Sequence, residues 1–270
     1  DKELNNHYYR FQNAQDIKSV FKTFKRLKNE DSLNDIFVNA YKKEFEYDFD
    51  NDIMLKYYPK RIIEKLVEGS FLELGLGHGY TISEFLNKVD SYTILEGSPA
   101  VIENFSKNEP DLFKKVNIIE TYFENYETDQ KFDNIVMGFI LEHVENPDLI
   151  LEKYKKFLTP KGKIFIAVPN AESLHRQIGF YGGYTNDLKK LSDADLLLGH
   201  RRYYDKNELE KLAKRHNLKI LSIEGIFLKP LMTSQLQSLK LSKEIINGML
   251  EMGKKYPELS NAILMELGNE

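Results

Sequence analysis

Three glycines stand at alternate positions between an apolar run and a helical pattern in SFLELGLGHGYTISEF, residues 70–85. Because Gly75, Gly77 and Gly79 lack a Cβ atom, the backbone there can turn with positive φ or come close to a ligand. A strand, a glycine loop and a helix N-terminus form a common binding place for nucleotide-like ligands at the carboxyl end of a sheet strand. The stretch therefore predicts a ligand-binding loop.

The spacing of these glycines argues against several nucleotide-binding classes. The dinucleotide fingerprint is G-x-G-x-x-G, whereas this chain has G-x-G-x-G preceded by the acidic Glu73. A Walker loop would need Gly-Lys-Ser/Thr, and His78-Gly79-Tyr80 offers no lysine. A short-chain dehydrogenase would need Tyr-x-x-x-Lys, and none of the 16 tyrosines has a lysine four residues on. A nicotinamide-dependent oxidoreductase is therefore the weaker alternative.

Short β-rich runs alternate with helical runs after the glycine loop. The β-rich runs are SFLELG, YTILEG, VNIIE, FDNIVMGF, GKIFIAVPN and LKILSIEG. Ser98 and Pro99 are suited to start one of the helices between them, and Asp205 with Glu208 forms a capping box for another over about residues 206–216. The alternation predicts an α/β fold with a mostly parallel sheet, because parallel neighbours need crossover helices.

The pattern divides the chain into three parts. We expect a helical N-terminal cap over residues 1–68, a ligand-binding domain over residues 69–230, and C-terminal helices over residues 231–270. An irregular insert at residues 171–204 follows GKIFIAVPN within the middle part. Loops of that length are usually functional or disordered, so the insert is a candidate for acceptor binding.

Five segments in order resemble the class I S-adenosylmethionine-dependent methyltransferase family. ELGLGHG resembles its E/D-x-G-x-G-x-G loop, and ILEGS resembles the end of its second strand. The other three are FENYETDQKFDNIVMGFILEHVENP, LTPKGKIFIAVPN and GHRRYYDKNELEKLAKRHNLKI. The resemblance covers about residues 71–229. It implies a Rossmann-like sheet of seven mostly parallel strands, helices on both faces, and a reversed last strand near GIFLKP.

The resemblance also implies S-adenosyl-L-methionine as the cofactor. Glu96, 21 residues after Gly75, would bind both ribose hydroxyls. Tyr122 and Phe123 would flank the adenine, with a plain core position for Phe123 left open. The implied cofactor-binding residues are Glu73, Gly75, Gly77, Gly79, Glu96, Gly97, Tyr122, Phe123 and Gly138.

Methyl transfer from a sulfonium is an in-line displacement that needs an aligned nucleophile within about 3 to 3.5 Å of the methyl carbon. A hydroxyl acceptor must also lose a proton to a general base. His143 in FILEHVENP follows the fourth strand, where cofactor and acceptor should meet. We therefore predict His143 as the catalytic base, with a structural histidine as the alternative.

Two basic groups in the insert are candidate acceptor-binding residues. They are His175 with Arg176, and His200 with Arg201 and Arg202. Arginine forks match carboxylate and phosphate geometry, so we predict an anionic acceptor such as a saccharide or a phosphate-bearing metabolite. Ordinary ion pairing is the alternative for each arginine.

We predict no metal site. Some quinone O-methyltransferases of similar sequence have an acid upstream of this Glu-His and use a metal, but here Phe139 and Ile140 occupy that region. No histidine pair has the His-x-x-x-His spacing of a zinc helix. DFDND, residues 48–52, lacks the glycine and the terminal glutamate of a calcium loop.

Composition limits the partners. The net charge of −4 and the pI near 6.0 make nucleic acid a poor first guess. The chain has no cysteine, which excludes thiolate chemistry and is compatible with a reducing compartment. No apolar run approaches the roughly 18 to 20 residues that span a bilayer. We therefore expect a soluble, cytoplasmic protein, with a homo-oligomer left open.

The sequence thus predicts S-adenosylmethionine-dependent methyl transfer to an oxygen, or less readily a nitrogen, of a small polar acceptor. Two alternatives remain. One is the nicotinamide-dependent oxidoreductase, and the other is a non-catalytic cofactor-binding scaffold that keeps Gly75 and Glu96 but lacks a competent acceptor pocket.

Overall fold

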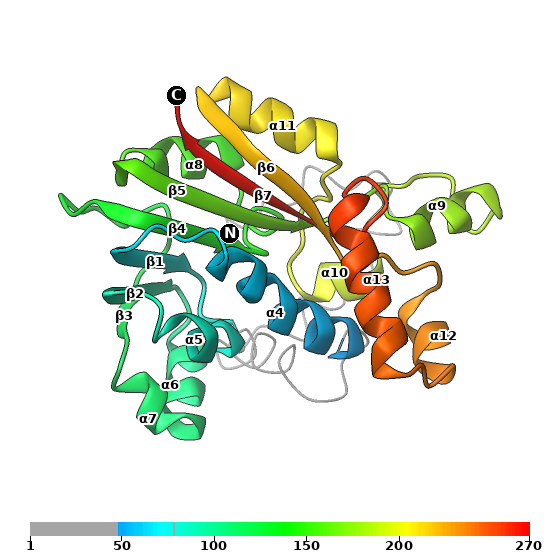
Figure 1. The fold of residues 1–270 in the computed structure, drawn as a ribbon, viewed down its shortest axis with the longest axis horizontal. Coiled ribbons are helices and arrows are strands. Elements are labelled where there is room, and N and C mark those ends of the chain that lie inside the picture. The colour runs from blue at the N-terminus through cyan, green and yellow to red at the C-terminus, as the bar shows by residue number, and fades with distance from the viewer. Residues whose placement is uncertain (1–47, 78) are drawn as a thin grey trace, which may run out of the picture.

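A seven-stranded sheet forms the centre of the computed structural model, which describes residues 48–77 and 79–270 (Figure 1). The predicted N-terminal cap therefore lies outside the described residues over 1–47. The strands are β1 (Ser70–Leu74), β2 (Ser91–Glu96), β3 (Asn117–Glu120), β4 (Phe132–Gly138), β5 (Leu158–Pro169), β6 (Leu218–Ile226) and β7 (Ala262–Asn269).

The strand order is β3-β2-β1-β4-β5-β7-β6. All pairs from β3 to β5 are parallel, whereas β7 runs antiparallel to both β5 and β6. The order in which the chain adds strands changes direction at β1. The chain first adds β2 and β3 on one side of β1, and then β4 and β5 on the other side. Ligands of open α/β sheets bind beside the carboxyl ends of the strands at such a switch point.

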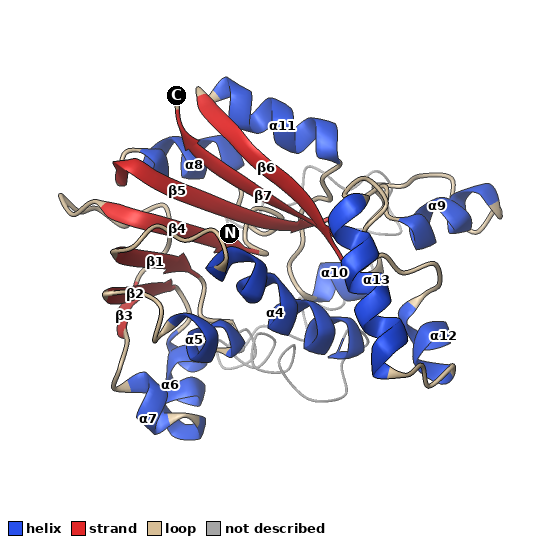
Figure 2. Cartoon of the chain, in the orientation of Figure 1, coloured by secondary structure: helices blue, strands red, loops and turns tan. Residues whose placement is uncertain are grey.

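Helices cover both faces of the sheet, as predicted (Figure 2). The described helices are α4 (Asp48–Ile63), α5 (Tyr80–Phe85), α6 (Pro99–Asn108), α7 (Pro110–Phe113), α8 (Pro147–Lys155), α9 (Leu174–Tyr181), α10 (Asp193–Leu197), α11 (Lys206–Arg215), α12 (Thr233–Ser238) and α13 (Lys243–Lys255). No described helix is both long and apolar enough to cross a membrane.

Two apolar clusters fix these helices to the sheet. Ile62 of α4, Phe85 of α5 and Phe105 of α6 belong to the cluster on one face, to which α12 and α13 also contribute. Tyr154 of α8 and Leu212 of α11 belong to the cluster on the other face. The result is the three-layer arrangement expected of a mostly parallel sheet.

The predicted capping signals are confirmed. Ser98 caps α6 by accepting a hydrogen bond from the backbone of Val101, with Pro99 at the first turn. Asp205 and Glu208 form the reciprocal capping box of α11. The insert at 171–204, expected to be irregular, contains the two short helices α9 and α10.

The prediction for the C-terminal part is right for α12 and α13 and wrong for residues 262–269. These residues form β7, which is the reversed strand, so the expected position near GIFLKP is wrong as well. Seven of the eight residues of β7 are buried because neighbouring strands and helices enclose it. A strand buried on both faces shows no alternation, and AILMEL is therefore indistinguishable by periodicity from a buried helix.

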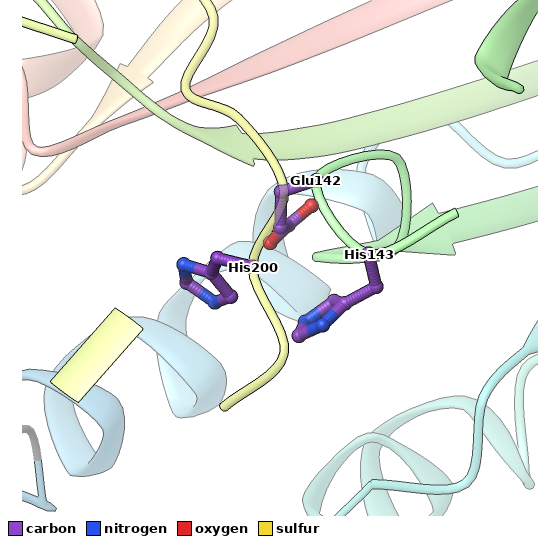
Figure 3. A group of neighbouring side chains, drawn as sticks. All are labelled: Glu142, His143 and His200. Carbon is purple, nitrogen blue, oxygen red and sulfur yellow. The ribbon is translucent and has the colours of Figure 1, made fainter. Parts of the chain in front are cut away.

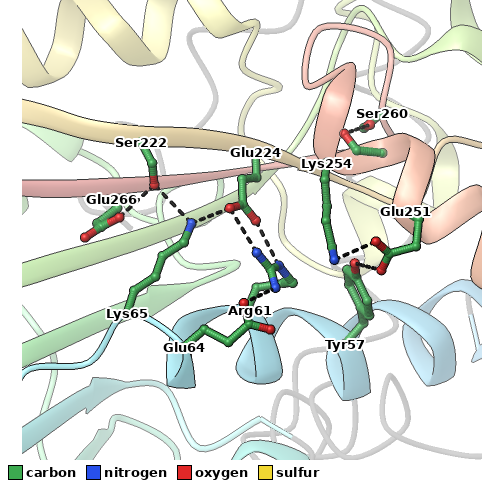
Figure 4. A network of polar contacts seen from close by, with 11 residues as sticks. Tyr57, Arg61, Glu64, Lys65, Ser222, Glu224, Glu251, Lys254, Ser260 and Glu266 are labelled. Carbon is green, nitrogen blue, oxygen red and sulfur yellow. Dashed lines mark hydrogen bonds and ion pairs between the residues drawn. The ribbon is translucent and has the colours of Figure 1, made fainter.

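A polar network joins α4 to β6 (Figure 4). Arg61 donates two hydrogen bonds to the Glu224 carboxylate, at 2.9 and 3.1 Å. Lys65 donates to the same carboxylate at 2.5 Å and to Ser222 at 3.0 Å. Since Arg61 and Glu224 are only 11% and 16% exposed, this pair is shielded from water and fixes α4 over the sheet.

We expect Glu224→Gln to lower the free energy of unfolding by about 1–3 kcal/mol, because two half-buried cations lose their charged acceptor. Burial would raise the pKa of Glu224, but hydrogen bonds from Arg61 and Lys65 outweigh burial and lower it. The stabilisation is therefore present above the unfolded pKa of about 4.3 and disappears as the pH falls through the lower folded value.

Urea unfolding at pH 7 and pH 3 measures this difference, which should shrink at pH 3. The control is Glu103→Gln, since Glu103 forms an exposed pair with Lys107 and such pairs contribute little to stability. Equal effects of the two substitutions at pH 7 would contradict a structural role for the Glu224 network.

Candidate active site

One cavity of about 900 Å³ lies at the carboxyl ends of the parallel strands. All nine residues predicted to bind the cofactor line it, as do five of the six predicted catalytic and acceptor-binding residues. Arg202 is the exception. The cavity also receives residues from α4, from the turn after β5 and from the segment after β6. The volume suits a drug-sized ligand or a pair of smaller ones.

The glycine loop has the backbone that its sequence predicts. Gly75, Gly77 and Gly79 have φ of 85°, 51° and 70°, a region that disfavours other residues. A Cβ on Gly75 would lie 2.7 Å from Ile140, and one on Gly79 would lie 2.5 Å from Phe105. A Cβ on Gly77 would meet nothing within 4 Å. Two of the glycines therefore serve close packing, and Gly77 borders open space.

Glu96 lies at the end of β2 with its carboxylate against the glycine loop. Its two oxygens accept hydrogen bonds from the backbone N–H groups of Leu76 at 3.0 Å and Ser98 at 2.8 Å. Burial raises the pKa of Glu96, although these backbone donors oppose the shift. The carboxylate also lines the cavity, so it is placed to accept hydrogen bonds from a pair of vicinal hydroxyls such as those of a ribose.

Glu73 is buried beneath the loop. It accepts a hydrogen bond from the Thr81 hydroxyl at 3.0 Å and another from the Tyr92 hydroxyl. Burial raises the pKa of Glu73 to about 7, against the effect of the two hydrogen bonds. Glu73 thus ties the first turn of α5 to β1 and β2, and it lines the cavity as well.

The remaining predicted cofactor residues form the wall beside Glu96. Tyr122 is 66% exposed, and a Cβ on Gly97 would lie 3.0 Å from its ring. Phe123 is half-buried and packs against the core while also lining the cavity, so both of its expected roles are compatible with its position. A Cβ on Gly138 would lie 2.3 Å from the Tyr58 hydroxyl, so this glycine makes room for α4.

The turn after β4 carries Glu142 and His143 (Figure 3). Glu142 is fully buried, and neither of its carboxylate oxygens has a hydrogen-bond partner. Burial raises the pKa of Glu142 to about 7. Burial also lowers the pKa of His143 to about 3, assisted by the neighbouring His200. His143 is therefore neutral at neutral pH, and it accepts a proton only weakly.

Arg202 does not line the cavity. Its guanidinium donates to the backbone carbonyls of Leu141, Val144 and Glu145, at 2.6 to 3.1 Å. Its assignment as an acceptor-binding residue stays a prediction, and this position does not support it, because these donors bond the turn after β4.

Arg201 also donates hydrogen bonds to the turn after β4. Its backbone N–H donates to the carbonyl of Glu142 at 2.8 Å, and its Nε donates to the carbonyl of His143 at 2.9 Å. The rings of His143 and His200 consequently meet edge to face, with centroids 4.7 Å apart. The predicted catalytic residue His143 and the predicted acceptor-binding residues His200 and Arg201 therefore form one cluster.

Arg176 and His175 line the acceptor side from α9. Arg176 donates to the carbonyls of Leu188 and Lys190, at 2.7 to 3.0 Å, and lies 4.1 Å from the centre of the Tyr203 ring. Burial lowers the pKa of His175 to about 2, with Lys229 and Arg176 adding to the shift. Arg176 thus mainly fixes the insert, and His175 presents a neutral imidazole.

Several residues on the acceptor side escaped the sequence analysis. Asp50 of α4 forms a buried ion pair with Lys229, and both bond to the Thr233 hydroxyl. Asp195 of α10 lies beside His200. The Ser192-x-x-Asp195 spacing is a recognisable capping box, but nothing local indicates that such a carboxylate faces a cavity.

The partnerless polar atoms gather in one place. Among the described residues, every buried side-chain nitrogen or oxygen without a hydrogen-bond partner belongs to a residue that lines this cavity. The atoms are Asp50 Oδ1, both Glu142 carboxylate oxygens, Ser173 Oγ, His175 Nδ1 and His200 Nδ1. Buried polar atoms are normally paired, so this wall is built for a polar ligand or ordered water.

Glu142, His143 and His200 each offer an atom that could ligate a cation, all within 4.8 Å of one another. Carboxylate and imidazole are ordinary ligands of zinc and related ions, but the same three groups are also the usual carriers of protons. The absence of a metal stays a prediction.

Comparison with known proteins agrees with this geometry. A family model described as a methyltransferase domain matches residues 46–223. The ubiquinone biosynthesis O-methyltransferase of Rickettsia typhi is 22% identical over 228 residues, which cover 79% of this chain and 85% of the relative.

Solved structures show the same fold. A glycopeptide N-methyltransferase complexed with S-adenosyl-L-methionine has a TM-score of 0.52 at 14% identity, covering 80% of this chain and 87% of that one. An S-adenosylmethionine-dependent methyltransferase from Clostridium acetobutylicum has a TM-score of 0.53 at 15% identity, covering 83% and 96%. The chain belongs to the class I S-adenosylmethionine-dependent methyltransferase family.

We expect Glu96→Ala to weaken binding of S-adenosylhomocysteine more than tenfold, because two hydrogen bonds to a charged acceptor, each worth about 1.5–3 kcal/mol, are lost. Isothermal titration calorimetry measures the affinity. Glu120→Ala is the matched control, since Glu120 pairs with Glu96 in the sheet register but is exposed and does not line the cavity. Equal affinities for both variants would exclude Glu96 from the cofactor site.

Proposed function

We propose that this methyltransferase transfers the methyl group of S-adenosylmethionine to an oxygen atom of a small polar acceptor that carries hydroxyl groups. One observation carries the proposal. A single cavity joins the glycine loop and Glu96, at one end, to a wall of buried polar atoms without partners at the other.

The cofactor supplies an electrophilic methyl group when it is bound. Glu96 would hold its ribose hydroxyls, and the backbone at Gly77 leaves room for close approach. On the acceptor side, His143 is neutral and lines the cavity, so its imidazole can help to position the acceptor. The protein's main contribution is then to position the acceptor oxygen in line with the methyl carbon and to exclude water.

An oxygen acceptor is favoured because a hydroxyl must lose a proton, and the cavity holds a cluster of imidazole and carboxylate groups. A neutral amine needs no base before it attacks, so this cluster would have less to do for a nitrogen acceptor. The relatives include methyltransferases named for each atom.

The buried polar atoms that line the cavity without hydrogen-bond partners indicate the chemical class of the acceptor. When ionised, Asp50 Oδ1 and the Glu142 oxygens can accept hydrogen bonds but not donate them, so they call for donors such as saccharide hydroxyls. Arg176 and Arg201 lie on the same wall and would favour a phosphate or carboxylate on the acceptor. A hydroxyl-bearing metabolite with one anionic group satisfies both.

The test is transfer of tritium from S-[methyl-³H]adenosylmethionine to a pool of sugars, sugar phosphates and hydroxybenzoates. We expect label in a hydroxyl-bearing product, with S-adenosylhomocysteine formed in equal amount, and at least tenfold less transfer by Glu96→Ala at subsaturating cofactor. Cofactor binding without transfer to any pool would favour the non-catalytic scaffold. Binding of NAD in place of S-adenosylmethionine would favour the oxidoreductase.

A further inference from the structure

Asp195 occupies a position on α10 that its role as a helix cap does not fully explain. It is 1% exposed and accepts hydrogen bonds from the backbone and hydroxyl of Ser192, both at 2.7 Å. The Tyr203 hydroxyl donates to it at 3.0 Å. Burial alone would raise the pKa of Asp195, but the neighbouring His200 and the hydrogen bonds from Ser192 outweigh burial and lower it to about 2. A buried, ionised carboxylate therefore stands at the edge of the cavity.

The His200 ring lies directly beside this carboxylate. Its Nδ1 is 3.3 Å from Asp195 Oδ1, a contact that is not aligned as a hydrogen bond. In structures without bound ligands, contacts between catalytic groups are often long or poorly aligned. The His200 side chain is 10% exposed and lines the cavity. An Nδ1 proton directed at Asp195 leaves Nε2 bare.

We propose that His200 Nε2 takes the proton of the acceptor hydroxyl, and that Asp195 is the positioning residue that keeps the other ring nitrogen protonated. The inference rests on the proposed function, which it deepens by assigning the base. It replaces His143 in that role and assigns to Asp195 a function that the sequence analysis did not recognise.

While the acceptor oxygen bonds to the methyl carbon, whose former bonding pair stays on sulfur, the O–H proton passes to Nε2 of His200. The ring becomes an imidazolium beside the Asp195 carboxylate, so no unpaired charge is created in the cavity. The proton leaves to water after the product departs.

His143 lacks the carboxylate that His200 has. Glu142 lies within 4.8 Å of both histidines, but among the described residues no counterpart of Asp195 stands beside His143. His200 and Arg201 oppose a positive charge on the His143 ring, and the carbonyls of Leu198 and Gly199 compensate only in part. The contrast in partners, rather than residue type, distinguishes the two histidines.

Other groups also face His200. From the turn after β4 come Glu142, which is buried, and the His143 ring at 4.7 Å between centroids. Tyr203 places its ring 6.5 Å away, and Arg201 follows His200 directly in the chain. Glu142 provides a second negative charge near both rings when it is ionised.

The first experiment requires no acceptor. We expect ¹⁵N NMR of the histidine rings, in the full chain saturated with S-adenosylhomocysteine, to show His200 protonated at Nδ1. In Asp195→Asn this preference should be lost, whereas Asp193→Asn, an exposed carboxylate on the same helix, should leave it unchanged. A proton on Nε2 in the wild type, or a tautomer that Asp195→Asn does not alter, would overturn the proposal.

The second experiment uses the acceptor found by the label-transfer test. Asp195→Asn and His200→Gln should each lower kcat roughly 10²- to 10⁴-fold, with S-adenosylhomocysteine affinity unchanged. The acid limb of the kcat/KM profile should disappear in His200→Gln, because the group that accepts the proton is gone. His143→Gln should keep that limb.

Two results would overturn the assignment in an active enzyme. One is an acid limb that disappears in His143→Gln and persists in His200→Gln. The other is activity that is abolished by a chelator and restored by a divalent ion, which would make the cluster a metal site. A wild-type enzyme that methylates nothing would instead refute the proposed function, and the NMR result would still decide the Asp195–His200 pair.

Discussion

The active site depends on the capture of the turn after β4 by the end of the insert. This turn is not helical, and the guanidinium of Arg202 donates hydrogen bonds to three of its backbone carbonyls, those of Leu141, Val144 and Glu145. A buried turn with unsatisfied carbonyls would be costly, so the two segments are obliged to meet. Their union brings His200 against His143 and encloses the cavity on its acceptor side.

Much of the fold could be predicted because its signals are local. The glycine loop needs positive φ at three places, and the caps at Ser98 and Asp205 act within one helical turn. β7 could not be predicted in the same way. Its residues become a strand only because β5 and β6 leave a place between them, and that place is set by contacts far apart in the sequence.

The site residues also differ in whether their sequence signal is local or depends on contacts far apart in the chain. The cofactor side is built mainly on motifs within short segments, and each predicted residue lines the cavity. The acceptor side is assembled from α4, the insert and the segment after β6, so the Asp50–Lys229 pair had no local signature. Arginine is also ambiguous in a sequence, because backbone carbonyls satisfy a guanidinium as well as a phosphate does. Arg202 illustrates this, while Arg201 has its Nε on a carbonyl and still lines the cavity.

The position of β7 has a consequence for biosynthesis. During translation β5 and β6 leave the ribosome before the strand that separates them, with α12 and α13 still to follow. Until residues 262–269 emerge, each of these two strands has an edge with open hydrogen-bonding groups, and such edges pair readily with other chains. The nascent chain would then be most prone to aggregation after β6 has emerged and before β7 has, and a chaperone that shields strand edges would have the greatest effect on yield in that interval.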